Sequence, residues 1–202
     1  MTPKIKFCGL TRVQDAAAAN ALLPDYAGFV FAPGSRRFVS DAGAAALRAA
    51  LDPRIAAVGV FVNDAPDHIA ALAAAGTIQI VQLHGQEDAA YLARLRALVS
   101  CPVWQAVRVD GPGDISLANA SPADLVVLDH GAGGTGRAFD WSLPAAMTRP
   151  FMLAGRLSPH NVADAIRLAH PFGVDTSSGI ETDGRKDPAK MAAFAAAVRQ
   201  FP

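Results

Sequence analysis

Residues 4–12 read Lys-Ile-Lys-Phe-Cys-Gly-Leu-Thr-Arg, and this stretch combines a short apolar strand, a turn and the start of a helix. The strand ends in Cys8, a glycine follows, and Thr11 stands where a helix cap is expected. A helix N-terminus stabilises nearby anions and lowers the pKa of a cysteine that faces it. Cys8 is therefore a candidate base or nucleophile, with an inert core cysteine as the alternative.

The same strand-and-helix unit recurs along the chain. Short apolar runs closed by turn residues occur at Lys4–Cys8, Tyr26–Phe31, Ala57–Val62, Ile78–Leu83, Val103–Val109, Leu125–Asp129, Phe151–Ala154 and Gly173–Ser177. Helical patterns lie between most of them, at Ala42–Leu51, Pro66–Ala75, Ala89–Val99, Asn161–Ala169 and Pro188–Phe201. Such alternation predicts a parallel sheet covered by helices. Eight units indicate an α/β protein with a (β/α)8 TIM barrel, and a doubly wound open sheet is the alternative.

One helix of the barrel is predicted to be abbreviated. Residues 110–122 read Asp-Gly-Pro-Gly-Asp-Ile-Ser-Leu-Ala-Asn-Ala-Ser-Pro, which supports at most one turn of the fifth helix. The chain has 202 residues, fewer than the roughly 250 that are typical of such barrels. No linker or low-complexity segment interrupts the pattern, so residues 1–202 are expected to form a single (β/α)8 barrel catalytic domain.

Composition excludes several classes of partner. Eighteen basic and eighteen acidic residues give zero formal net charge, so neither nucleic acid nor an anionic membrane is an expected partner. The two cysteines, Cys8 and Cys101, are too few for a disulfide framework and favour a reducing compartment. No signal-peptide pattern and no membrane-length apolar run is present. We therefore expect a cytoplasmic protein that acts on a small molecule.

The strand ends carry the candidate catalytic groups, because a TIM barrel has its active site at the C-terminal ends of the strands. Cys8 ends the first predicted strand and Asp129 ends the sixth, on the opposite side of the barrel. A carboxylate in an apolar barrel end is desolvated, which raises its pKa and suits it to general acid catalysis. A helix-capping role for Asp129 is the alternative. An acid and a base that face each other across a pocket suit an isomerisation by proton transfer.

The last two strands are followed by a candidate phosphate site. Gly155 and Arg156 follow the seventh strand, and Ser178 and Gly179 follow the eighth. Small residues let backbone N–H groups approach phosphate oxygens closely, and barrels often bind phosphate in these two loops. An ordinary turn is the alternative. Arg36 and Arg37 are interpreted either as solvated surface residues or, opposite these loops, as the source of one guanidinium that clamps a substrate carboxylate.

Other polar residues at strand ends are expected to line the same pocket. They are Gln82, His84 and Asp175, although His84 is equally well interpreted as a polar core residue. The glycine-rich segment Gly131–Gly136 is interpreted as a loop that closes over the substrate, with a plain turn nearly as well supported. The histidines show no spacing typical of a metal site, so neither a metal nor another cofactor is expected.

Motifs spread over the whole chain carry a resemblance to a known family. They are Lys6-Phe-Cys-Gly-Leu-Thr-Arg12, Gly28-Phe-Val-Phe-Ala-Pro-Gly-Ser-Arg-Arg37, Val58-Gly-Val-Phe-Val-Asn63, Val81-Gln-Leu-His-Gly85, Gly133-Gly-Thr-Gly136 with Phe139 and Trp141, and Gly173-Val-Asp-Thr-Ser-Ser-Gly-Ile-Glu181 with Lys186-Asp187. In this order they resemble the phosphoribosylanthranilate isomerases of tryptophan biosynthesis. The resemblance implies an Amadori rearrangement of N-(5-phosphoribosyl)anthranilate to the 1-deoxyribulose phosphate without a cofactor.

The resemblance also implies residue roles. Asp129 is the general acid that protonates the ring oxygen, and Cys8 is the base that removes the proton from sugar C2. Arg37 binds the anthranilate carboxylate. Gly155, Ser178 and Gly179 bind the phosphate together with nearby backbone amides. The chain departs from the family where a second glycine usually follows Gly155, because Arg156 stands there and either reaches the phosphate or reshapes the loop. Other enzymes of the tryptophan pathway are conceivable partners that nothing in the sequence indicates.

The residues at the strand ends also argue against the functions of related TIM-barrel enzymes. A histidine-pathway sugar isomerase is expected to use two opposed aspartates, whereas the first strand here ends in Cys8. Indole-glycerol-phosphate synthase needs a lysine at the barrel end, and the strand lysines here are Lys4 and Lys6. A pentose-phosphate epimerase needs metal-binding histidines and aspartates. A binding-only barrel and a bifunctional sugar-phosphate isomerase remain the alternative functions.

Overall fold

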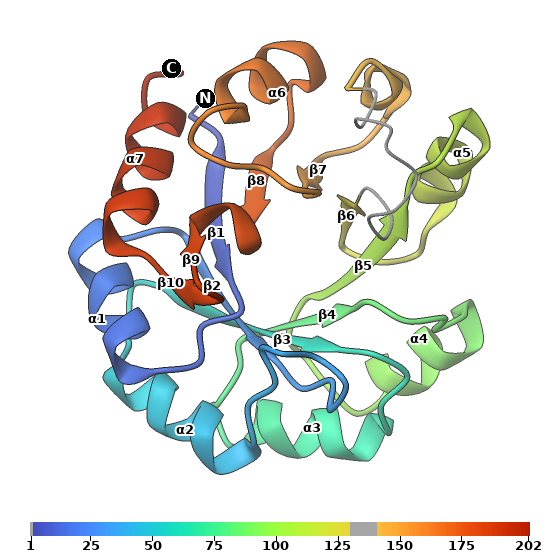
Figure 1. Ribbon diagram of the computed structural model, residues 1–202. Helices are drawn as coiled ribbons and strands as arrows, with labels where there is room; N and C mark the ends of the chain where they lie inside the picture. Colours follow the sequence, from blue (N-terminus) through green and yellow to red (C-terminus); the bar gives the residue numbers. More distant parts are fainter. Residues whose placement is uncertain (1, 130–140) are drawn as a thin grey trace.

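The computed structural model describes residues 2–129 and 141–202 and shows a closed barrel of eight parallel strands (Figure 1). The strands are β1 (Lys4–Cys8), β2 (Tyr26–Val30), β3 (Ala56–Phe61), β4 (Ile80–Leu83), β5 (Val103–Arg108), β6 (Leu125–Asp129), β7 (Phe151–Leu153) and β8 (Gly173–Thr176). The barrel closes because β8 pairs with β1, with Lys4 opposite Gly173 and Phe7 opposite Thr176. This pairing confirms the barrel and excludes the open sheet.

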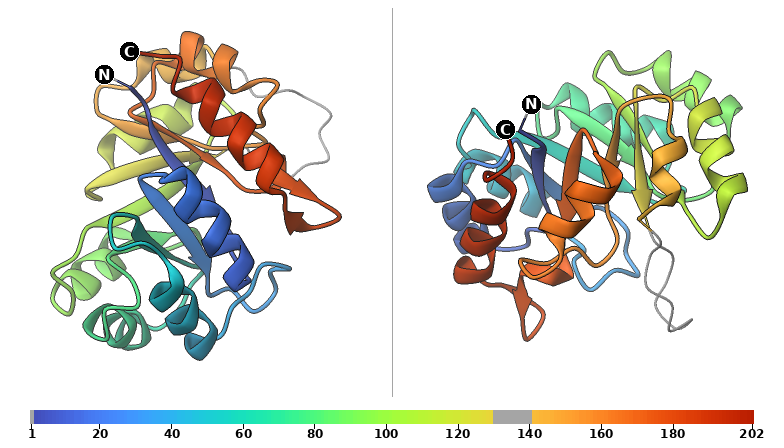
Figure 2. Two further views of the ribbon diagram at one scale, coloured as in Figure 1. Left: turned by 90° about the vertical axis from the view of Figure 1, so that its left-hand side faces the viewer. Right: turned by 90° about the horizontal axis from the view of Figure 1, so that it is seen from above.

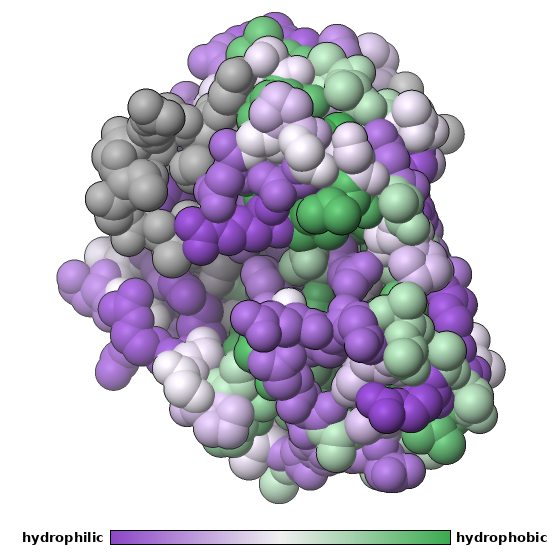
Figure 3. All heavy atoms as spheres, turned by 90° about the vertical axis from the view of Figure 1, so that its right-hand side faces the viewer, coloured by the Kyte–Doolittle hydropathy of each residue, from purple (hydrophilic) through white to green (hydrophobic). Residues whose placement is uncertain are grey.

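Helices surround the barrel. They are α1 (Val13–Leu22), α2 (Asp41–Ala50), α3 (Pro66–Ala74), α4 (Ala89–Arg96), α5 (Pro112–Ala120), α6 (Val162–Ala169) and α7 (Pro188–Val198), with two short 3₁₀ helices, η1 (Leu143–Ala146) and η2 (Ser178–Ile180). A two-stranded hairpin, β9 (Glu181–Thr182) and β10 (Arg185–Lys186), follows η2. The two ends of the chain lie close together, as Figure 2 shows. On the face drawn in Figure 3, hydrophilic side chains predominate over small hydrophobic patches, as expected for amphipathic helices.

Side chains alternate between the two sides of the barrel wall, as the period of two in a strand requires. On β1, Ile5 and Phe7 belong to the large hydrophobic core between the strands and the helices. Lys6 and Cys8 occupy the alternate positions and face the barrel interior. The interior is filled by a smaller apolar cluster of Val58, Ile80, Trp104, Leu125, Val127, Met152 and Ala154. The same alternation places Asp129 on the inner side of β6.

The prediction that the fifth helix is abbreviated is wrong. Helix α5 spans Pro112–Ala120, and it buries Ile115 and Ala118. Pro112 occupies the first helical turn, where its missing N–H costs nothing. The Asp114 carboxylate accepts hydrogen bonds from the backbone N–H groups of residues 110 and 111. The Gly, Pro and Asp residues that were interpreted as a turn therefore start a helix. In the described part of the segment between β6 and β7, the helical element is the short 3₁₀ helix η1.

The expected cap of the first helix is also different. The N-cap residue of α1 is Arg12, and the Asp15 side chain accepts hydrogen bonds from the backbone N–H groups of Thr11 and Arg12. The almost fully buried Asp15 carboxylate, rather than the predicted Thr11 hydroxyl, therefore supplies the side-chain hydrogen bonds at the start of this helix. The other predicted strands and helices lie within a few residues of the observed ones.

Candidate active site

A pocket of about 350 Å³ opens at the C-terminal ends of the strands, which we call the mouth of the barrel. Its walls consist of Cys8, Val30, Ala32, Ser35, Arg37, Val60, Val62, Gln82, His84, Asp129, Ala154, Gly155, Arg156, Asp175, Ser177 and Ser178. The structure thus brings together every predicted site residue except Gly179, which follows Ser178 directly. Arg36 is exposed and does not line this pocket. The segment Gly131–Gly136 lies outside the described residues.

Cys8 stands at the end of β1 and is partly exposed to the pocket. Burial raises the pKa of its thiol above the ordinary value, whereas the Lys6 ammonium lowers this pKa and the Asp175 carboxylate raises it further. The expectation that a helix N-terminus lowers the pKa of Cys8 is therefore wrong. Helix α1 begins only at Val13, and the charged groups that act on the thiol are side chains of the barrel interior.

Asp129 is contacted by a short chain of polar side chains, Gln82 on β4 and His84 directly after it. Its Oδ2 atom lies 3.2 Å from Nε2 of His84, and Nδ1 of His84 lies 3.4 Å from Nε2 of Gln82. If the Gln82 amide donates to Nδ1, the proton of the His84 ring is on Nε2 and faces Asp129. Both His84 and Asp129 remain partly exposed in the pocket, whereas Gln82 is buried. The pair therefore presents an oriented carboxyl group to a ligand.

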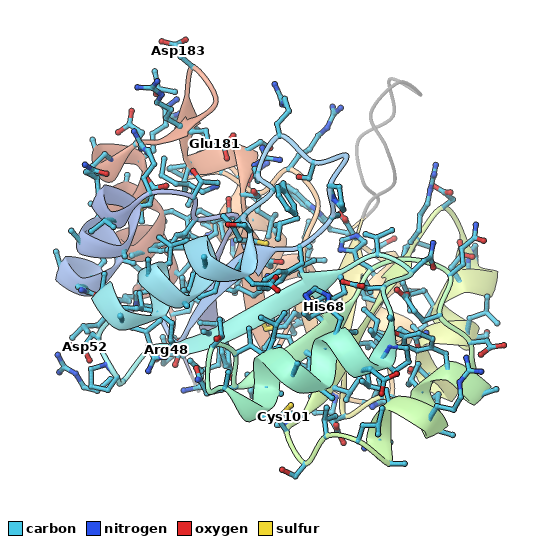
Figure 4. All side chains as sticks on the ribbon, turned by 90° about the horizontal axis from the view of Figure 1, so that it is seen from below. Arg48, Asp52, His68, Cys101, Glu181 and Asp183 are labelled. Atoms are coloured by element: carbon cyan, nitrogen blue, oxygen red, sulfur yellow. The ribbon has the colours of Figure 1, made fainter. Side chains whose placement is uncertain are left out.

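Arg37 is held by the hairpin that follows η2. Its Nε and Nη2 atoms donate to the two carboxylate oxygens of Glu181 at 2.7 and 2.8 Å. Nζ of Lys186 donates to the same carboxylate at 2.7 Å. Burial alone would raise the pKa of Glu181, but Arg37 and Lys186 hold it at about 2. Figure 4 shows Glu181 at the base of the hairpin and Asp183 at its tip. Glu181 therefore carries a negative charge that fixes Arg37 in the pocket wall.

The loops after β7 and β8 meet at the side of the pocket. Gly155 and Arg156 both have positive φ angles, 96° and 55°. A Cβ atom on Gly179 would lie 1.9 Å from the carbonyl oxygen of Leu157, so only glycine fits where the two loops touch. The Ser177 hydroxyl donates to the carbonyl oxygen of Cys8 at 3.0 Å. These contacts join the predicted phosphate loops to the strand that carries the thiol.

Sequence reasoning missed three residues of this site. Lys6 is completely buried beside Cys8, and Glu181 and Lys186 fix Arg37. A lysine in the middle of an apolar strand was a signal for the first of them. Nothing in the sequence near Arg37 indicated its partner, which lies 144 positions away.

Two kinds of feature are absent from the described residues. No cluster of three or more His, Cys, Asp or Glu side chains is placed to hold a metal ion. No helix in residues 2–129 and 141–202 has the length and apolar character needed to cross a membrane.

Comparison with known proteins identifies the family. Residues 5–197 match the family described as N-(5'phosphoribosyl)anthranilate (PRA) isomerase. The chain is 45% identical over 193 residues to the N-(5'-phosphoribosyl)anthranilate isomerase of Endomicrobium trichonymphae, with 94% of each chain covered. It is 42% identical over 207 residues to that of Dechloromonas aromatica, covering 99% of this chain and 98% of the relative.

Solved structures agree with the sequence relatives. The crystal structure of phosphoribosyl anthranilate isomerase from Thermotoga maritima superposes with a TM-score of 0.89 at 34% identity, covering 98% of this chain and all of that one. A phosphoribosyl anthranilate isomerase in complex with reduced 1-(o-carboxyphenylamino)-1-deoxyribulose 5-phosphate gives a TM-score of 0.87 at 33% identity, with the same coverage. The chain belongs to the N-(5'-phosphoribosyl)anthranilate isomerase family.

Proposed function

We propose that this isomerase of tryptophan biosynthesis rearranges N-(5'-phosphoribosyl)anthranilate by acid–base catalysis, with Asp129 as the acid and Cys8 as the base. The observation that carries the proposal is the shared pocket. Cys8 at the end of β1 and Asp129 at the end of β6 line one cavity at the mouth of the barrel. A proton donor and a proton acceptor on opposite walls can act on neighbouring atoms of one sugar.

The reaction needs two proton transfers by the protein. Asp129 gives a proton to the ring oxygen of the ribose, the bond from that oxygen to C1 breaks, and a protonated Schiff base forms with the anthranilate nitrogen. The Cys8 thiolate then takes the proton from C2, and the electron pair of the C–H bond forms the C1–C2 double bond of an enolamine. Tautomerisation moves the proton of the C2 hydroxyl to C1 and leaves a ketone. Transfer of a proton from Cys8 to Asp129 through solvent restores both groups.

Arg37 is the proposed site for the anthranilate carboxylate. Glu181 occupies the Nε and Nη2 edge of the guanidinium, and five N–H donors are available in total. The remaining donors suffice for a second carboxylate. Holding one guanidinium edge on a fixed anion removes rotamer freedom before the substrate binds, which favours binding.

The phosphate of the substrate is assigned to the loops after β7 and β8. Gly155 and Arg156 line the pocket from the loop after β7 and Ser178 lines it from the loop after β8, and Gly179 lets the two loops approach. Gln82 and Asp175 are buried and offer oxygen acceptors without a partner among the described residues, which suits the sugar hydroxyl groups.

The setting of the enzyme belongs to the same proposal. A base that works as a thiolate has to stay reduced, so we place the protein in the cytoplasm. We treat residues 1–202 as one catalytic domain, because the pocket takes residues from strands and loops along the whole barrel. The phosphorylated substrate is the proposed partner.

Turnover of freshly generated phosphoribosylanthranilate, followed by the loss of its anthranilate fluorescence, tests the proposal. The native chain is expected to turn over, and Cys8→Ala and Asp129→Asn variants that stay folded are expected to lose about 10²–10⁴-fold in kcat. Cys101→Ser is the matched control, since Cys101 lies at the other end of the barrel (Figure 4) and does not line the pocket. Binding without turnover by the native chain would favour a barrel that only binds a phosphorylated ligand.

A further inference from the structure

Lys6 is the least expected residue of the barrel interior. Lysine is almost never fully buried unless it is paired, and the Lys6 side chain has no exposed surface. Its Nζ atom lies 3.0 Å from Oδ2 of Asp175 on the neighbouring strand β8. Burial alone would lower the pKa of Lys6, but Asp175 and Cys8 outweigh this effect and raise it. The interior of the barrel therefore contains an ammonium group directly below the thiol.

Gly28 makes room for both Lys6 and Cys8. It lies opposite Cys8 in the pairing of β1 with β2. A Cβ atom built on Gly28 would come within 2.8 Å of Sγ of Cys8 and within 3.2 Å of Nζ of Lys6. The sulfur and the ammonium therefore pack against the same point of β2. The contact follows from the strand itself, because residues 6 and 8 face the same side.

Stability does not explain why this ion pair is kept. Replacing a buried ion pair by apolar side chains of similar volume is often neutral or stabilising. In addition, Oδ1 of Asp175 is buried and has no hydrogen-bond partner among the described residues, so the carboxylate is not fully satisfied. A buried charge pair with an unsatisfied atom, next to a thiol in the pocket wall, is better explained by what it does to the thiol.

We infer that Lys6 is a positioning residue for the reaction, whose ammonium group stabilises the thiolate form of Cys8 against burial, whereas the Asp175 carboxylate, its partner in the ion pair, opposes this effect. The inference rests on the proposed role of Cys8 as the base. Four charged groups act on the thiol or are acted on by it: Lys6 on β1, Asp175 on β8, Lys186 on β10 and Arg37 after β2. Of these four groups Lys6 has the largest effect on Cys8, and it acts against the still larger effect of burial.

The two members of the ion pair shift the pKa of Cys8 in opposite directions. A purely structural role of the pair would not produce opposite shifts in the two single variants, so measuring these shifts tests the inference. The rate of alkylation by iodoacetamide is measured against pH in a Cys101→Ser background, since the thiolate is the reactive form. Lys6→Met is expected to move the inflection to higher pH by about one unit or more. Asp175→Asn is expected to move it to lower pH. No shift in either variant, or shifts in the same direction, would overturn the inference.

A double variant provides a test that remains valid if Lys6→Met alone does not fold. Lys6→Met alone leaves a buried, unpaired carboxylate, whereas Lys6→Met with Asp175→Asn removes both charges. Circular dichroism establishes that the variant is folded. Lys6 has a larger effect than Asp175 on the pKa of Cys8. The alkylation rate of the double variant is therefore expected to inflect at a higher pH than that of the native chain and at a lower pH than that of Lys6→Met. An inflection at or below the native pH would contradict the inference.

Kinetics separates this inference from the proposed function. Lys6→Met is expected to lower kcat near neutral pH and to regain activity as the pH rises. Alkylation needs no substrate, so its shifts can appear even if the native chain does not turn over, and then the proposed function alone fails. An unchanged pH profile of kcat in Lys6→Met, with Cys8→Ala inactive, would overturn the inference and leave the proposed function standing.

Discussion

Arg37 and Glu181 form a two-pronged ion pair at the mouth of the barrel, with N–O distances of 2.7 and 2.8 Å. The pair joins the loop after β2 to the hairpin after β8, two segments at distant positions in the chain. Such fork-to-fork contacts fix the plane of the guanidinium as well as its position. Glu181 therefore decides which donors of Arg37 are free for a ligand.

Glu181→Gln is expected to raise KM with little change in kcat. The variant loses a charge-assisted contact of about 1.5 kcal/mol, so Arg37 is no longer fixed and KM rises about 10-fold. Steady-state kinetics measures both constants. Asp183→Asn is the matched control, because it makes the same change from carboxylate to amide at the tip of the same hairpin. An equal rise of KM in both variants would show that the hairpin, rather than the ion pair, is responsible.

Acid is expected to weaken the fold through Glu181. Its pKa is about 2 in the folded protein and ordinarily 4.5, so the folded state holds the ionised form more strongly than the unfolded chain does. The resulting stability is complete above pH 4.5 and is lost as the pH falls towards 2. Urea denaturation at pH 6 and pH 3 is expected to show a smaller loss of unfolding free energy in Glu181→Gln than in the native chain. An identical loss in both proteins would contradict this origin.

Arg156→Gly is expected to change stability and binding in opposite directions. Arg156 has a φ angle of 55°, which costs a non-glycine residue about 1 kcal/mol, so glycine is expected to raise the free energy of unfolding by up to that amount. Loss of the guanidinium is expected to raise KM about 10-fold if it contacts the phosphate as proposed. His170→Gly, with a φ angle of 46° at an exposed helix end, relieves the same backbone conformation without touching the pocket. An unchanged KM in Arg156→Gly would remove Arg156 from the phosphate site.

Gly28→Ala is expected to lower kcat strongly, although it adds only one methyl group. The added methyl group would come within 2.8 Å of the Cys8 sulfur, so the thiol has to move, and a displacement of about 1 Å can cost about 100-fold in rate. Gly34→Ala is the control, because a Cβ atom there meets nothing within 4 Å. A native kcat in folded Gly28→Ala would show that the position of the sulfur is not critical.

The strands were predictable from the sequence because each is a continuous apolar run closed by turn residues. β1 and β6 have the predicted boundaries, and these two strands end in Cys8 and Asp129. Once the barrel is recognised, the position of a residue at a strand end is enough to place it at the mouth. This is why nearly all predicted site residues line one pocket.

What the sequence concealed depends on contacts formed only in the closed barrel. Helix α5 was missed because its start signals, Pro112 and Asp114, are also turn residues, and only Ile115 and Ala118 anchor it. The pKa of Cys8 was misjudged because its surroundings come from strands at the two ends of the chain, which meet when β8 pairs with β1. No local sequence pattern indicates which side chains become neighbours when these two strands pair.

The central claim is that Cys8 removes the proton from C2 of the sugar. Single-turnover loss of fluorescence, measured with ordinary substrate and with substrate carrying deuterium at C2, tests it most directly. We predict a slower reaction of the deuterated substrate with the native chain, and a rate lower by about 10²–10⁴-fold in folded Cys8→Ala. Turnover by Cys8→Ala at the native rate would contradict the claim.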